Sequence, residues 1–185
     1  SRISSSELSE LMHVTASQIR QDLNHFGGFG QQGYGYRVDY LYREIGRILG
    51  LDSVRNLILI GAGNLGRALA QYTNYRERGF LIEAIFDKDK EKIGTMVQDI
   101  PVRDIEDLPG YLKMHDVDIA TLTIPKEEAV KVAQVLADNG VKAIWNFAHT
   151  DLNVPQDVAV ENVHLSESLM SLSYKIKEKQ GESES

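Results

Sequence analysis

Residues 56–66 read Asn56-Leu57-Ile58-Leu59-Ile60-Gly61-Ala62-Gly63-Asn64-Leu65-Gly66, and this stretch decides the fold class. The order predicts an apolar strand over 56–60, a G-x-G-x-x-G turn, and a helix that continues through 67–72. The first glycine allows the tight turn, the second lets backbone N–H groups approach a pyrophosphate, and the third permits close strand–helix packing. The helix N-terminus favours negative charge there. We therefore predict a Rossmann dinucleotide site that includes Gly61, Ala62, Gly63, Asn64, Leu65 and Gly66.

A second apolar strand, over residues 80–86, ends at Asp87, which lies twenty-one residues beyond Gly66. A carboxylate at this place can accept hydrogen bonds from both hydroxyls of an adenosine ribose and would repel a 2′-phosphate. It favours NAD(H) over NADP(H), although Lys88 and Lys90 weaken the preference. Asp87 and Lys88 join the predicted cofactor site. The alternative is a Rossmann-like domain with another ligand, such as coenzyme A.

Three further strands are expected over residues 118–123, 143–147 and 158–163, with a helix from Lys126 to Asn139 that Gly140 closes. Strands that alternate with helices predict an α/β fold with parallel crossovers and a ligand at the carboxyl ends of the strands. Three residues occupy such ends, and we predict that they line the nicotinamide half of the site; an ordinary structural role at a strand end is the alternative for each. They are Thr123, Pro125 and Asn146.

Residues 5–25 predict two short helices joined by a tight turn at 13–14. Ser5 and Ser6 can cap the first helix, and Thr15 the second, which runs to His25. Ile19, Leu23 and Phe26 are spaced to form one inward face of the second helix. The outward face then carries hydrogen-bonding side chains that can reach base edges or phosphates from a major groove: Ser17, Gln18, Arg20, Gln21 and Asn24.

Residues 26–36 contain five glycines interleaved with aromatic residues and predict a glycine-rich hairpin. Two helices and a hairpin make a winged helix-turn-helix, whose wing glycines let the backbone approach a sugar–phosphate surface. The predicted wing contacts are Gly33, Tyr34, Gly35 and Arg37. A small helical pair without DNA binding is the alternative. Such a module has another helix before Ser5, and the sequence begins without methionine, so we expect this first helix to be missing.

Three modules follow from these patterns. Residues 1–50 form the winged helix DNA-binding domain and an amphipathic linker helix over 38–49, and residues 51–164 form the Rossmann domain. Residues 165–185 form a C-terminal helix and tail. The apolar stripe of this helix requires a partner surface, either its own domain or a second subunit. Its members are Leu165, Leu169, Leu172 and Ile176.

Composition excludes several classes of function. The chain has no cysteine, which rules out disulfides, thiolate metal sites and cysteine nucleophiles and suits an intracellular protein. No apolar run approaches the roughly 18 residues of a membrane span, so we expect a cytoplasmic protein. Residues 1–50 hold five of the 20 basic and five of the 27 acidic residues, so the net charge of −7 resides in the remainder. DNA binding must therefore depend on arrangement rather than on bulk charge.

Catalysis is not expected, and we predict no catalytic residue and no metal site. A dehydrogenase needs a substrate-holding domain and a positioned acid or base, and the predicted Rossmann domain ends near His164. His149 and His164 are the only histidines beside the candidate site, and a structural or surface role is the usual one. Two alternatives remain: an NAD-dependent oxidoreductase, and a nucleotide-binding subunit of a larger enzyme that docks through the winged module.

Several separated motifs together resemble one family, the bacterial redox-sensing transcriptional repressors Rex. The resemblance spans almost the whole chain and keeps the motifs in order and spacing. It rests on Arg20-Gln21-Asp22-Leu23, Phe26-Gly27, Gly33-Tyr34-Gly35-Tyr36, the Gly61–Gly66 turn, Phe86-Asp87, Asn146-Phe147-Ala148 and Leu152-Asn153-Val154-Pro155.

The resemblance implies a homodimer that binds a palindromic operator when NADH is scarce and releases it when NADH binds. It also implies that the C-terminal helix is swapped into the partner subunit. Two departures from the family pattern bear on the site. Gln31-Gln32 stands where many members have a basic residue before the wing glycine, and His164 stands where members commonly carry an aspartate that takes part in switching.

Overall fold

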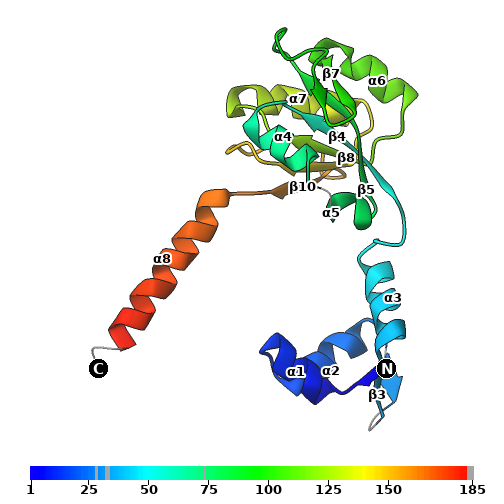
Figure 1. Ribbon diagram of the computed structural model, residues 1–185, viewed down its shortest axis with the longest axis vertical. Coiled ribbons are helices and arrows are strands. Elements are labelled where there is room, and N and C mark those ends of the chain that lie inside the picture. The colour runs from blue at the N-terminus through cyan, green and yellow to red at the C-terminus, as the bar shows by residue number, and fades with distance from the viewer. Residues whose placement is uncertain (28, 32–33, 73, 183–185) are drawn as a thin grey trace. The chain divides into compact units, whose positions relative to one another are not determined.

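The computed structural model describes residues 1–27, 29–31, 34–72 and 74–182, and two units divide the chain, Ser1–Val54 and Arg55–Ser185 (Figure 1). Each unit has its own sheet, with three strands in the first and seven in the second. In the part of the chain that is described, no helix has both the length and the apolar character that crossing a bilayer requires.

The sheet of the second unit has the strand order β10-β9-β8-β4-β5-β7-β6, in which only the β6–β7 pair is antiparallel. The order reverses between β4 and β8, and such a switch point is where α/β sheets bind ligands. The predicted α/β class with a Rossmann domain is confirmed. The strands are β4 (Arg55–Ile60), β5 (Phe80–Asp87), β6 (Met96–Val97), β7 (Ile100–Asp104), β8 (Ile119–Leu122), β9 (Ala143–Asn146) and β10 (Ala159–Asn162).

The helices of this unit differ from the prediction in two ways. The helix after the glycine turn begins at Asn64 rather than at residue 67, because Gly63 already serves as its N-cap. The sequence patterns also missed the elements between residues 88 and 117, where the strands are short. The helices are α4 (Asn64–Ala70), α5 (Asn74–Glu77), the 3₁₀ helix η1 (Ile105–Asp107), α6 (Leu108–Met114), α7 (Lys126–Asp138) and α8 (Leu165–Glu182) (Figure 1).

The apolar run of β4 is continuous because both faces of the strand are covered. Ile58 and Ile60 belong to a core cluster that includes Leu136 of α7 and Leu108 at the start of α6. The intervening Leu59 belongs to a second cluster, against which α4 packs. The two clusters hold the ends of β4, β5 and β8 rigidly, which fixes the loops that follow these strands.

The N-terminal unit has the predicted order of two helices followed by a hairpin, and its third strand, β1, was not predicted. β3 lies between β1 and β2 and is antiparallel to both. The elements are β1 (Arg2–Ile3), α1 (Ser5–Met12), α2 (Ala16–His25), β2 (Gly30–Gln31), β3 (Gly35–Arg37) and α3 (Val38–Ile48).

Two local predictions for this unit were wrong. The cap of α1 is Ser4 rather than Ser5 or Ser6: Ser4 Oγ accepts the Glu7 N–H at 3.1 Å, and the Ser4 N–H donates to Glu7 Oε2 at 2.7 Å. This reciprocal capping box satisfies two backbone donors at once, which the serines inside the helix cannot do. Phe26 is exposed rather than inward, because α2 ends at His25 and Phe26 packs on the edge of that ring.

The apolar side chains of two helices, α3 and α8, are largely exposed to solvent. On α3 only Leu41 is buried, so most of the expected apolar stripe of the linker helix is not covered. On α8 every member of the stripe is more than half exposed: Leu165 60%, Leu169 69%, Leu172 53% and Ile176 52%.

Candidate functional site

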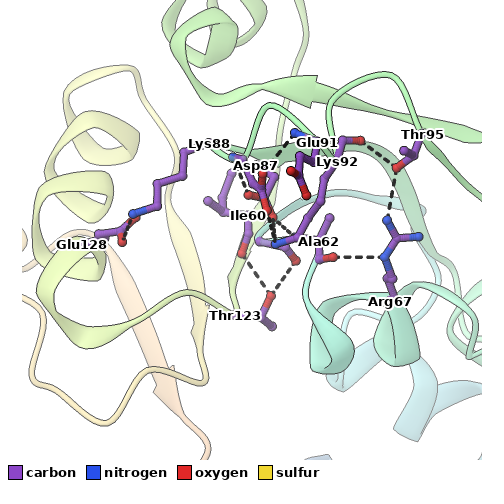
Figure 2. A network of polar contacts seen from close by, with 12 residues as sticks. Ile60, Ala62, Arg67, Asp87, Lys88, Glu91, Lys92, Thr95, Thr123 and Glu128 are labelled. Atoms are coloured by element: carbon purple, nitrogen blue, oxygen red, sulfur yellow. Dashed lines mark hydrogen bonds and ion pairs between the residues drawn. The ribbon is translucent and has the colours of Figure 1, made fainter.

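The glycine turn after β4 is held by its own backbone and by Thr123 (Figure 2). Gly61 has a φ of +105°, and a Cβ on Gly66 would lie 1.9 Å from the Gly61 carbonyl oxygen. Thr123 Oγ1 donates to the Ile60 oxygen at 3.1 Å and to the Gly61 oxygen at 2.9 Å. No larger residue fits at 61 or 66, which explains two of the three glycines by contacts within the protein.

Gly63 differs from the other two glycines. It caps α4 with a φ of −77°, and a Cβ there would meet no atom within 4 Å. The N–H groups at the start of a helix have no acceptor within the helix, so the first turn of α4 offers donors beside this open space. Of the three glycines, Gly63 is the one whose missing side chain leaves room for a ligand.

Asp87 connects the second strand to the glycine turn (Figure 2). Its Oδ2 accepts the Ala62 N–H at 2.7 Å, its Oδ1 accepts the Asp89 N–H at 2.9 Å, and Lys92 Nζ lies 3.3 Å from Oδ2. Burial alone would raise the pKa of Asp87, but the two backbone donors and the Lys92 ammonium outweigh it and lower the pKa. Three of about four acceptor positions on this carboxylate are thus occupied, which leaves room for one ribose hydroxyl rather than two.

The lysines around Asp87 are each paired with a carboxylate. Lys88 Nζ lies 2.6 Å from Glu128 Oε1, and Lys90 pairs with Asp104. The hydrogen bond and charge of each partner raise the pKa of Lys88 and of Lys90. Because each of these cations already has a carboxylate partner, a 2′-phosphate would have to compete with that partner, which favours NAD(H) over NADP(H).

A cavity of about 690 Å³ lies at the carboxyl ends of β4, β5 and β8. Six predicted residues line it: Gly61, Gly63, Asp87, Lys88, Thr123 and Pro125. Five predicted residues do not line it: Ala62, Asn64, Leu65, Gly66 and Asn146. The sequence patterns missed eight others: Ile60, Asp89, Lys92, Ile105, Ile124, Glu128, Lys131 and Val132. Three of these, Ile60, Asp89 and Ile124, are adjacent to a predicted position, and Lys92 lies in the loop after β5. The other four come from η1 and α7, which no motif marks.

Asn146 is fully buried, and both polar atoms of its side chain form hydrogen bonds within the protein. Its Nδ2 donates to the Thr150 oxygen at 3.0 Å and to Asn162 Oδ1 at 2.8 Å, and its Oδ1 accepts the Ala148 N–H at 3.0 Å. Asn146 therefore shapes the loop after β9 and ties it to the end of β10. This is the structural role that the sequence left open for a residue at a strand end.

The outward face of α2 presents all five predicted side chains to solvent. Two of them are engaged: Arg20 Nη1 donates to Ser5 Oγ at 3.1 Å, and Gln18 Nε2 donates to Asp22 Oδ1 at 2.7 Å. The other three make no side-chain hydrogen bond to the described part of the chain, and they are Ser17, Gln21 and Asn24.

Two of the predicted wing residues, Gly35 and Arg37, already make contacts within the protein. Gly35 has a φ of +67°, and a Cβ there would lie 2.8 Å from the Ile3 oxygen, so its close approach is to β1. Arg37 Nη2 lies 2.6 Å from Asp39 Oδ2, and this hydrogen bond and charge lower the pKa of Asp39. Tyr34 is 71% exposed. Gly33 and Gln32 lie outside the described residues.

Comparisons with known proteins agree with the division of the chain into an N-terminal and a C-terminal unit. Residues 52–150 match the family described as CoA binding domain, and residues 1–24 match the family described as putative DNA-binding protein N-terminus. The redox-sensing transcriptional repressor Rex of Caldanaerobacter subterraneus subsp. tengcongensis is 54% identical over 97% of this chain and 80% of that protein. The protein of the same name from Clostridioides difficile is 54% identical over 96% of this chain and 84% of that protein.

Solved structures show the same similarity. The crystal structure of RSP in complex with β-NAD+ and operator DNA has a TM-score of 0.92 at 52% identity, and the match covers 99% of this chain and 84% of that chain. The crystal structure of RSP with β-NADH has a TM-score of 0.89 at 49% identity, covering 99% of this chain and 86% of that chain. RSP is described as a Rex-family repressor.

Proposed function

This chain belongs to the Rex family of redox-sensing transcriptional repressors, and we propose that it binds NAD(H) at the glycine turn and operator DNA through α2. It represses by binding a palindromic operator when NADH is low, and it releases the operator when NADH binds. The observation that carries the proposal is the identity of more than half over almost the full chain, which includes both the DNA-binding and the nucleotide-binding unit.

The nucleotide is proposed to follow the usual Rossmann direction across the sheet. Asp87 accepts from an adenosine ribose hydroxyl, and the first turn of α4 donates to the pyrophosphate beside Gly63. The nicotinamide half then extends toward the ends of β8 and β9, where Thr123 and Pro125 line the cavity. The remaining predicted residues contribute to nucleotide binding by shaping the loops or through their backbone N–H groups. They are Ala62, Asn64, Leu65, Gly66, Lys88 and Asn146.

Coenzyme A is the alternative ligand, because the matched family is described as CoA binding domain. It shares the adenosine and the pyrophosphate with NAD(H) but carries a 3′-phosphate on the ribose. That phosphate would face the carboxylate of Asp87, whose lowered pKa keeps it anionic and which therefore repels it. This repulsion favours NAD(H).

The DNA-binding unit is proposed to span residues 1–50 and to place α2 in the major groove. Ser17, Gln21 and Asn24 are the free donors and acceptors for base edges, with Gln18 and Arg20 beside them. Tyr34, Gly35, Arg37 and Gly33 make up the wing. The exposed stripe of α8, within residues 165–185, packs into a second copy of the chain, which gives the homodimer that a palindrome requires.

We further propose that the chain, whose nucleotide-binding domain spans residues 51–164, does not catalyse hydride transfer and acts in the cytoplasm, where bacterial operator DNA lies. Every relative described above bears the name of a regulator. Incubation with NAD+ and a panel of 2-hydroxy acids and aldehydes, followed at the absorbance of NADH, should give no turnover. Steady NADH formation would overturn this part of the proposal.

NADH binding can be measured directly because the chain has a single tryptophan, Trp145 on β9. Energy transfer from Trp145 to NADH should quench its emission in a saturable way, and NAD+ should reverse the quenching. Coenzyme A at the same concentration should not. Quenching that coenzyme A reverses better than NAD+ does, or an absence of quenching, would contradict the proposed cofactor.

A further inference from the structure

Two histidines lie together at the carboxyl edge of the sheet, outside the cavity described above. His149 follows β9 and His164 follows β10, the neighbouring parallel strand. Their Nδ1 atoms are 3.3 Å apart, and their rings are nearly parallel, with centroids 5.5 Å apart and an interplanar angle of 24°. His149 is exposed and His164 is partly buried, so the pair is accessible from solvent.

The loops that carry the pair are tied to one another. The Val163 N–H donates to the Asn146 oxygen at 2.8 Å, directly before His164. The buried Asn146 amide bonds Asn162 Oδ1 on one side and the Ala148 N–H on the other, directly before His149. The segments directly before both histidines are thus anchored to one buried residue, Asn146. Bringing the rings together therefore costs little conformational entropy on binding.

The distance between the two nitrogens matches that of two ligands on one metal ion. Histidine binds Zn²⁺ at about 2.0–2.1 Å, and two such bonds at a tetrahedral angle place the nitrogens about 3.3 Å apart. In the metal-free pair, the same two nitrogens can be bridged by only one proton, with one ring as donor and the other as acceptor. A metal ion would replace that proton and satisfy both nitrogens.

We propose that His149 and His164 form a two-histidine site for a divalent transition-metal ion of borderline softness, Zn²⁺ being the representative. Imidazole suits Zn²⁺, Ni²⁺ and Cu²⁺ and disfavours Mg²⁺ and Ca²⁺, which prefer oxygen. Residues 1–27, 29–31, 34–72 and 74–182 contain no group of three or more His, Asp or Glu side chains that could hold a metal ion. Water or a soluble ligand therefore completes the coordination, and the site is open rather than structural.

The test is isothermal titration calorimetry of ZnCl₂ into the full chain, free of any affinity tag and without nucleotide or DNA. We expect one Zn²⁺ per chain, with affinity reduced about tenfold or more in His149→Ala and in His164→Ala. MgCl₂ should give no binding. His115→Ala is the matched control, because His115 lies in the same unit, where its Nδ1 is 2.9 Å from the Tyr111 oxygen and its ring stacks on Tyr111.

Wild-type affinity for Zn²⁺ in both His149 and His164 variants, equal weakening in His115→Ala, or no binding of Zn²⁺ at millimolar concentration would overturn the proposal. Circular dichroism of each variant, measured without metal, shows whether it is folded. If an alanine variant is unfolded, His149→Gln and His164→Gln replace it, with the same expected loss. Because the titration needs neither NADH nor operator DNA, its outcome is independent of the proposed function.

Discussion

The two candidate surfaces of this chain are built in opposite ways. At the nucleotide site, the glycine turn, Asp87 and Thr123 are linked by short hydrogen bonds, and Asp87 is only 7% exposed. On α2, the side chains proposed to contact DNA are all exposed, and three of them make no side-chain hydrogen bond to the described residues. The nucleotide site is therefore preformed, whereas the DNA surface gains its partners only on binding. Substitutions should separate the two: those that break the contacts within the first region affect folding and binding together, and those on α2 affect binding alone.

The largest effect is expected from Gly66→Ala. The added Cβ would lie 1.9 Å from the Gly61 carbonyl oxygen, which belongs to the backbone and cannot move cheaply. We expect a loss of about 3 kcal/mol in the free energy of unfolding and a loss of NADH binding. Urea denaturation followed by Trp145 emission measures the first, and NADH quenching the second.

Gly63→Ala is the matched control, because its Cβ would meet no atom within 4 Å. Its free energy of unfolding should change by less than about 1 kcal/mol, while NADH binding weakens because the methyl group occupies the space proposed for the pyrophosphate. Equal destabilisation by the two substitutions would mean that close packing does not define the glycine turn.

Asp87→Ala should destabilise the protein by about 2 kcal/mol at neutral pH, because it leaves the buried Ala62 N–H and the partly buried Asp89 N–H without their acceptor. The pKa of Asp87 is lowered in the folded state, so its ionised form stabilises the fold above its unfolded value of about 3.9. That contribution is lost as the pH falls through the folded pKa. The difference between wild type and variant, measured by urea denaturation, should shrink below about pH 4. A difference that is constant from pH 7 to pH 3 would rule out the charged form as its source.

Gln21→Ala and Asn24→Ala should each weaken operator binding about tenfold and leave the free energy of unfolding within about 0.5 kcal/mol of wild type. Both side chains are exposed on α2 and make no side-chain hydrogen bond to the described residues. Fluorescence anisotropy with a labelled operator measures the binding. A variant that loses stability as well as affinity would show that α2 is not an independent contact surface.

The smallest effect is expected at the wing. Arg37 is paired with Asp39, so Arg37→Ala should change operator affinity by less than about threefold. Asp39→Ala frees the guanidinium and should tighten binding by a similar factor, with a steeper dependence on salt. The slope of affinity against salt concentration, measured for both variants, checks the pair. A large loss in Arg37→Ala would show that Arg37 leaves Asp39 to contact DNA.

The same contrast explains what the sequence could predict. The Rossmann strands were predictable because β4 and β5 are apolar runs that both faces of the sheet bury, and the glycines at 61 and 66 are enforced by sterics. The part of the cavity that α7 lines could not be predicted. Glu128 and Lys131 lie on a helix without a motif, and the place of that helix beside Asp87 depends on the crossover from β8. Sequence patterns also do not show which charged side chains form ion pairs. Lys88, Lys90 and Arg37 each have a carboxylate partner that the sequence does not reveal.

In the N-terminal unit, helix existence was predictable and side-chain burial was not. Thr15 caps α2 as expected, yet Phe26, which its spacing placed on the inward face, is exposed. A short helix has few turns over which periodicity can distinguish a core face. β1 was missed because two residues carry no pattern of their own and are ordered by pairing with β3.

The most direct test of a NADH-responsive repressor is fluorescence anisotropy of a labelled palindromic duplex with the full chain, first in excess NAD+ and then with added NADH. The chain should bind the duplex in NAD+ and release it as NADH is added, and Asp87→Ala should bind the duplex but resist release. Duplex binding that NADH does not alter, or an absence of binding in either nucleotide while NADH still quenches Trp145, would contradict the account.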